Sequence, residues 1–83
     1  MKKFVVLGLY ISDHMKESYK VQDVLTKFGC SIKTRLGLHN IEDDALKSNG
    51  LILLELIGDS DEMQKLENEL LKIEGLKVQK MVF

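Results

Sequence analysis

Two stretches of the chain are almost continuously apolar and short enough to be strands. One covers residues 51–57 between Gly50 and Gly58, where six of the seven side chains are aliphatic and Glu55 is the exception. The other covers residues 4–11. Runs of this length are typical of strands covered on both faces, because a helix of that hydrophobicity is normally longer. We therefore expect both to be interior strands of one sheet.

Two other stretches repeat apolar positions every three or four residues, the spacing of an amphipathic helix. The first covers residues 14–28, with a side-chain cap from Ser12 or Asp13 before it. Gly29 follows and is expected to end the helix in a left-handed turn. The second helix should begin at Asp59 with Glu62 three residues later, a capping-box spacing, and end at Gly75. The apolar positions are Val21, Val24, Leu25 and Phe28 in the first helix and Met63, Leu66, Leu70 and Ile73 in the second.

Residues 32–39 and 76–83 are of mixed polarity, as expected for strands at the edges of a sheet. In the earlier one, alternation places Ile32, Thr34, Leu36 and Leu38 on one face and Lys33, Arg35, Gly37 and His39 on the other. Residues 40–49 carry three acidic side chains and end in a turn signal, so they should form a long hairpin loop.

The order strand, helix, strand, strand, helix, strand predicts one α+β domain over residues 1–83. With the apolar strands inside, the sheet order is fourth, first, third, second. This is the ferredoxin-like βαββαβ sandwich, with both helices on one face of an antiparallel sheet.

The face of the sheet that the helices leave open is too apolar for water. Its side chains are expected to be Phe4, Val6, Gly8, Tyr10, Leu51, Leu53 and Ile57, with Glu55 among them. A contiguous apolar patch on a small domain usually marks an interface, so we expect a homodimer, a homotetramer or another oligomer. Glu55 should lie beside Arg35 as a partly buried ion pair, or else act as a ligand-binding carboxylate.

Composition limits the classes of partner. The chain has 83 residues and a formal charge of -1, which gives no electrostatic reason to bind nucleic acid or anionic lipid. The single cysteine, Cys30, is expected to be a small buried side chain and suits a reducing compartment. The apolar stretch near the N-terminus is too short for a signal peptide or a membrane span, so we expect a cytoplasmic protein.

The sequence shows no catalytic constellation. Cys30 and His39 are nine residues apart on one extended segment, too distant to form a nucleophile and base. A serine elbow, a phosphate loop and a dinucleotide fingerprint are all missing from the sequence. We do not expect an enzyme.

One polar cluster is a candidate metal site. The predicted topology brings His14, His39 and the acidic residues Glu42, Asp43 and Asp44 to the same end of the sheet. Imidazoles with carboxylates can bind a divalent ion such as Ni, Zn or Fe, within one chain or across a dimer. The alternative is an exposed first helical turn and a solvated loop.

Several segments together resemble a known family. They are TRLGLH at residues 34–39, SNGLILLEL at 48–56, GDSDE at 58–62 and IEGLKVQKMVF at 73–83. They resemble the small stand-alone proteins called iron-only hydrogenase system regulators, which look like ACT regulatory domains and the C-terminal domain of nickel-responsive repressors. The resemblance implies an oligomeric regulatory module with effectors at the interface. The loop after the first strand departs from ACT domains because it lacks their usual glycine or proline.

The resulting interpretation is an ACT-like regulatory domain that senses a metal ion or small effector at an oligomer interface and signals to a protein partner. The metal candidates are His14 and His39, and the effector or interface candidates are Tyr10, Arg35, Glu55, Asn40 and Asp43. The alternative is a scaffold module that binds no ligand and docks a partner protein on its exposed sheet face.

Overall fold

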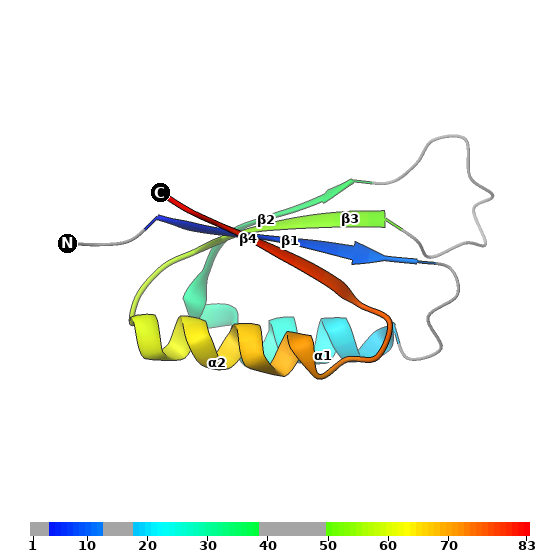
Figure 1. The fold of residues 1–83 in the computed structure, drawn as a ribbon. Helices are drawn as coiled ribbons and strands as arrows, with labels where there is room; N and C mark the ends of the chain where they lie inside the picture. Colours follow the sequence, from blue (N-terminus) through cyan, green and yellow to red (C-terminus); the bar gives the residue numbers. More distant parts are fainter. Residues whose placement is uncertain (1–3, 13–17, 39–49) are drawn as a thin grey trace.

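The computed structural model describes residues 4–12, 18–38 and 50–83. In chain order the elements are β1 (Val5–Ile11), α1 (Tyr19–Lys27), the 3₁₀ turn η1 (Gly29–Ser31), β2 (Ile32–Leu38), β3 (Gly50–Leu56), α2 (Ser60–Leu71) and β4 (Lys77–Val82). Figure 1 shows two layers, with both helices below one face of the sheet. The predicted start of the first helix near His14 lies outside the described residues, as does Asp13, one of the two predicted cap residues.

The sheet confirms the predicted topology. The strand order is β2-β3-β1-β4, and every neighbouring pair is antiparallel. The two apolar strands, β1 and β3, lie inside, and the two strands of mixed polarity lie at the edges. The architecture is therefore the ferredoxin-like α+β sandwich.

Alternation along the central strands separates the two faces of the sheet. The side chains of Leu7, Leu9 and Leu54 are completely buried against the helices, while their neighbours along the strands point the other way. The helices complete the core with Val21 and Leu25 from α1 and Met63, Leu66 and Leu70 from α2. A single apolar core thus lies between the helices and one face of the sheet.

The ends of α2 follow the sequence signals only in part. Asp59 caps the helix, because its carboxylate accepts a hydrogen bond of 2.9 Å from the backbone N–H of Asp61. Glu62 is not seen completing the capping box and pairs with Lys65 at 3.2 Å instead. Gly75 follows the helix at a φ of 85°, as its left-handed position requires.

Gly29 differs from its prediction. It begins η1 without a positive φ, so α1 does not end in a left-handed glycine. Phe28 is the C-cap residue of α1. Its backbone N–H instead donates a hydrogen bond of 3.0 Å to the carbonyl oxygen of Val24. A 3₁₀ turn thus replaces the glycine cap as the means of closing the helix.

A β-bulge near the start of β2 changes which side chains share a face. Ile32 pairs with Leu56 and Thr34 pairs with Glu55, so the intervening residue, Lys33, has no partner of its own on β3. Ile32 therefore packs against the core, whereas Thr34 shares the open face with Glu55. The prediction that Ile32, Thr34, Leu36 and Leu38 share one face is wrong because the extra residue shifts the alternation.

Candidate functional site

The face of the sheet opposite the helices carries a continuous apolar surface, here called the open face. Exposed large side chains reach it from all the strands or from residues that flank them. They are Phe4, Tyr10, Leu36, Leu38, Leu51, Ile57, Met81 and Phe83. Val6 and Leu53, which are half-buried, lie between them. The predicted open face is confirmed and is wider than expected, because both edge strands contribute to it.

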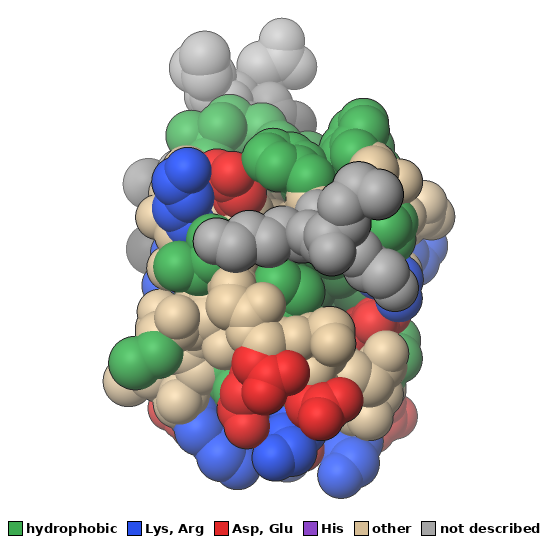
Figure 2. All heavy atoms as spheres, turned by 90° about the vertical axis from the view of Figure 1, so that its left-hand side faces the viewer, with side chains coloured by type: hydrophobic (Ala, Val, Ile, Leu, Met, Phe, Trp, Pro, Cys, Tyr) green, Lys and Arg blue, Asp and Glu red, His purple; other side chains and the backbone are tan. Residues whose placement is uncertain are grey.

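The two ends of the open face differ in character. At one end the rings of Phe4 and Phe83 meet edge to face, with centroids 5.6 Å apart and an interplanar angle of 73°. At the other end Tyr10 of β1 lies opposite Lys77 of β4 and Leu51 of β3. Figure 2 looks onto the first end and shows hydrophobic side chains over its upper, sheet side and charged side chains over its lower, helix side.

Glu55 is the acidic side chain of the described open face. Its Oε1 accepts a hydrogen bond of 3.0 Å from the Thr34 hydroxyl, and its Oε2 lies 3.9 Å from Lys33 Nζ. Only 23% of the Glu55 side chain is exposed. Within the described residues, the carboxylate therefore lies among apolar side chains with one direct hydrogen bond and a longer ion pair.

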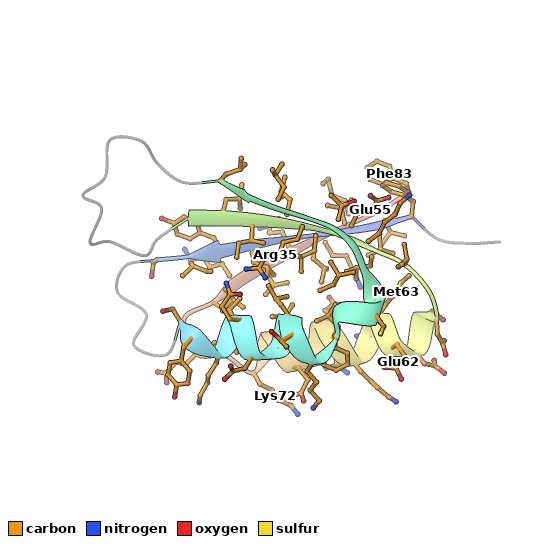
Figure 3. All side chains as sticks on the ribbon, turned by 180° about the vertical axis from the view of Figure 1, so that it is seen from behind. Arg35, Glu55, Glu62, Met63, Lys72 and Phe83 are labelled. Atoms are coloured by element: carbon orange, nitrogen blue, oxygen red, sulfur yellow. The ribbon has the colours of Figure 1, made fainter. Side chains whose placement is uncertain are left out.

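The predicted pair of Arg35 and Glu55 is wrong. Arg35 pairs with Leu54 across the ladder, and Leu54 faces the helices. The Arg35 guanidinium donates a hydrogen bond of 2.7 Å to the side chain of Gln22 on α1. Figure 3 shows Arg35 between the sheet and the helices and Glu55 on the opposite side of the sheet. Arg35 thus links β2 to α1 and is not part of the open face.

Two hollows lined by described residues flank the end of the sheet that carries Phe4. The larger, of about 290 Å³, lies beside Glu55 and is lined by Phe4, Lys33, Glu55, Leu56, Ile57, Gly58 and Met63. The smaller, of about 100 Å³, lies between α2 and β4, beside an ion pair of 2.9 Å between Lys80 and Glu67. The larger hollow is the one that adjoins the open face, and it combines an apolar lining with one carboxylate and one ammonium group.

The remaining predicted site residues are placed as follows. His14, His39, Asn40 and Asp43 lie outside the described residues, as do Glu42 and Asp44. Among the residues that are described, no three His, Cys, Asp or Glu side chains gather closely enough to hold a metal ion. Tyr10 and Glu55 do share the open face, but they lie toward opposite ends of it.

Cys30 is not the buried side chain that was predicted. It lies exposed in η1 as a free thiol, because the 3₁₀ turn packs Ser31 inward instead. Sequence reasoning also missed Met81, Phe83, Leu36 and Leu38 as members of the open face. The alternation of residues 77, 79, 81 and 83 was the signal that could have placed the C-terminal pair.

Comparisons with known proteins agree with this architecture. No protein-family model matches the chain, and no curated protein matches it either. An uncharacterised protein of Thermotoga maritima has a similar solved structure, with a TM-score of 0.80 and 26% sequence identity over 100% of this chain and 99% of that one. These values show a shared fold over the whole length of both chains.

Two further solved structures are similar at lower identity. One is a protein of Thermus thermophilus described as a putative PII-like signalling protein, with a TM-score of 0.52 and 10% identity over 98% of this chain and 89% of that one. The other is CPII of Thiomonas intermedia, solved with ADP, AMP and acetate, with a TM-score of 0.50 and 13% identity over 98% and 88% of the two chains. These likenesses show the fold.

Neither described helix is long and apolar enough to cross a membrane.

Proposed function

We propose that this chain is a small regulatory domain that acts as an oligomer, with copies associating through the open face. The single observation that carries the proposal is the apolar surface around Glu55, which extends across all the strands of the sheet. An isolated small domain would expose that surface to water at a considerable cost in free energy. Association with a second copy removes the cost.

The area of the open face supports this assignment. An aromatic side chain covers about 150–250 Å², and with a value in the lower half of that range for all eight exposed side chains, on the order of 700 Å² is uncovered. The largest apolar patch of an ordinary monomer is about 300–600 Å². A standard interface buries about 800 Å² on each partner. The open face is thus large for a monomer and close to the size that a stable dimer needs.

The regulatory part of the proposal is that the oligomer binds a small effector or a divalent metal ion and passes the signal to a protein partner. The hollow beside Glu55 adjoins the proposed interface and suits a small molecule with both apolar and polar groups. A metal ion would use His14 and His39. The resemblance in sequence to ACT-like hydrogenase-system regulators supports a regulatory role without catalysis. A signalling role is also compatible with the fold that this chain shares with the PII-like protein.

A thermal melt of the purified, chelator-treated protein tests the effector proposal. The panel contains Ni²⁺, Zn²⁺ and Fe²⁺, the nucleotides ADP and AMP that CPII was solved with, and amino acids. A ligand that binds only the folded state adds about 2.7 kcal/mol at 100 times its Kd, which raises the Tm by several degrees in a domain of this size. A rise in Tm caused by a metal ion should disappear in His14→Ala and His39→Ala and persist in the control Cys30→Ala.

If no compound in the panel raises the Tm, the effector proposal is overturned, and a scaffold module that binds no ligand is favoured. One observation already fits that second candidate. Within residues 4–12, 18–38 and 50–83, the open face gathers exposed large apolar side chains from all the strands of the sheet, as a docking surface for a partner protein would. Capture of a specific protein by the wild-type chain, and not by a variant with Leu36→Glu on the open face, would support the scaffold.

A further inference from the structure

We propose that two copies pair face to face with their strands antiparallel, related by a two-fold axis that crosses the strands. The end of one open face that carries Phe4 and Phe83 then covers the end of the other that carries Tyr10 and Lys77. This inference rests on the proposed self-association through the open face and adds to it the orientation of the partner. The second copy is the occupant because the exposed apolar area matches that of one side of a standard dimer.

The strand register fixes what such a pairing would bring together. Along β1 the open face carries Phe4, Val6, Gly8 and Tyr10 in sequence. An axis across the strands, placed between Val6 and Gly8, sets each Val6 over the partner's Gly8 and each Phe4 over the partner's Tyr10. Facing sheets pack about 10 Å apart with their strands roughly aligned, so these pairs are within reach of each other.

Gly8 is the strongest sign that something outside the chain covers the face. Its backbone has no positive φ, so the conformation does not require glycine. A Cβ built on it would come no closer than 3.7 Å to Leu53 and 3.9 Å to the backbone oxygen of Gln79, both ordinary contacts. The fold alone would therefore accept a side chain here. A glycine inside a strand often marks the close approach of another surface, and the partner's Val6 fits that depression.

Charge placement selects this axis over one that runs along the strands. Lys77 at the start of β4 and Phe83, which follows its last residue, both lie on the open face, at opposite ends of it. An axis across the strands sets the Lys77 ammonium over the exposed ring of the partner's Phe83, a favourable cation–π arrangement. An axis along the strands would set Lys77 over the partner's Leu38, where the ammonium group loses water and gains no partner.

Sedimentation tests whether this face makes the contact. We expect Gly8→Val to weaken self-association at least tenfold while leaving the far-UV circular dichroism unchanged, and Gly8→Ala to act in the same direction if the larger variant misfolds. Gly37→Val is the matched control, because Gly37 also lies in a strand but pairs with Ile52 on the helix side. Unchanged association in both folded Gly8 variants would overturn the inference. A wild-type chain that stays monomeric would overturn the proposed self-association as well.

Cross-linking then tests the orientation. In a Cys30→Ser background, a chain with Phe4→Cys is mixed with an affinity-tagged chain with Tyr10→Cys and treated with a bismaleimide that spans about 10 Å, the spacing of facing sheets. The proposed axis predicts the mixed cross-link and no self-cross-link of Phe4→Cys, since the two copies of position 4 would be about 20 Å apart along the strands. Self-cross-linking of Phe4→Cys, or a dimer with no mixed product, would overturn the orientation. Neither result would bear on the effector proposal, which the thermal melt tests separately.

Discussion

The hydroxyl of Thr34 on β2 donates a hydrogen bond of 3.0 Å to Oε1 of Glu55 on β3. The two residues are register partners on the open face, so this bond joins an edge strand to its inner neighbour. It also holds a carboxylate in an apolar surface, with the exposed Lys33 ammonium 3.9 Å away. A charge held in this way affects whatever covers the open face.

We predict that Glu55→Gln strengthens self-association. Covering the open face removes the remaining water from the carboxylate, and a charge is costlier to desolvate than an amide. The Gln side chain still offers an oxygen to the Thr34 hydroxyl. We expect the dimer to gain about 1 kcal/mol, roughly fivefold in Kd, measured by sedimentation equilibrium at pH 7.

The matched control is Glu62→Gln on α2, which removes the same charge from the helix side and should leave the dissociation constant unchanged. An equal gain in both variants would mean that net charge, and not the position of Glu55, governs association. A weaker dimer in Glu55→Gln would indicate that the carboxylate binds a donor of the partner.

The two-residue period of the central strands is the reason that the fold could be predicted from the sequence. Leu7 and Leu54 pack on the helices while Val6 and Leu53 face the other way, as alternation requires. The bulge could not be predicted in this way, because one extra residue such as Lys33 leaves no compositional signal. It reversed the side assigned to Arg35 and so broke the predicted ion pair.

The candidate site was predictable where it depends on one strand and not where it depends on register. Tyr10 and Glu55 follow from alternation along β1 and β3. Phe83 joins the site because β4 pairs with β1 so that its backbone N–H bonds to the carbonyl oxygen of Phe4 at 2.8 Å. Such cross-strand pairings are set by the turns and the packing of the whole sheet, which a local sequence pattern does not contain.

We predict that Leu70→Ala destabilises the domain severely and that the adjacent Leu71→Ala does not. Leu70 is completely buried in the core, whereas 58% of Leu71 is exposed on α2. Truncating a buried leucine leaves a cavity and costs about 2–5 kcal/mol, while an exposed site usually changes stability by about 0.5 kcal/mol or less. Urea unfolding followed by circular dichroism measures both, and similar costs would contradict the assignment of the core.

Removal of the cap on α2 should have a smaller effect. Asp59→Ala deletes the oxygen that accepts the Asp61 N–H and should cost about 1 kcal/mol of unfolding free energy. Asp59→Asn keeps an acceptor at the same place and is the control, with a loss of a few tenths of a kcal/mol. Equal losses in the two variants would indicate that the charge at the helix N-terminus matters more than the hydrogen bond.

Glu69 should give the domain a salt-sensitive acid response. A hydrogen bond of 3.2 Å from Lys27 on α1, with the Lys72 ammonium 3.5 Å from the other oxygen, holds the pKa of the Glu69 carboxyl below its usual 4.5. A lowered folded-state pKa stabilises the protein above the unfolded value, and this stabilisation is lost as the pH falls through the folded one. Glu69→Gln should therefore unfold at lower urea than the wild type at pH 7 and at the same urea near pH 2.

High salt provides the control for that experiment. The Lys27 and Lys72 side chains that pair with Glu69 are mostly exposed. Salt at 0.5 M should therefore reduce the difference between the wild type and Glu69→Gln at pH 7, since the Debye length falls from about 10 Å at 0.1 M toward 3 Å at 1 M. Glu74→Gln, which lies after α2, should show no such dependence. A difference that persists unchanged at pH 2 and in high salt would mean that Glu69 stabilises the contact of α1 with α2 by packing, not by its charge.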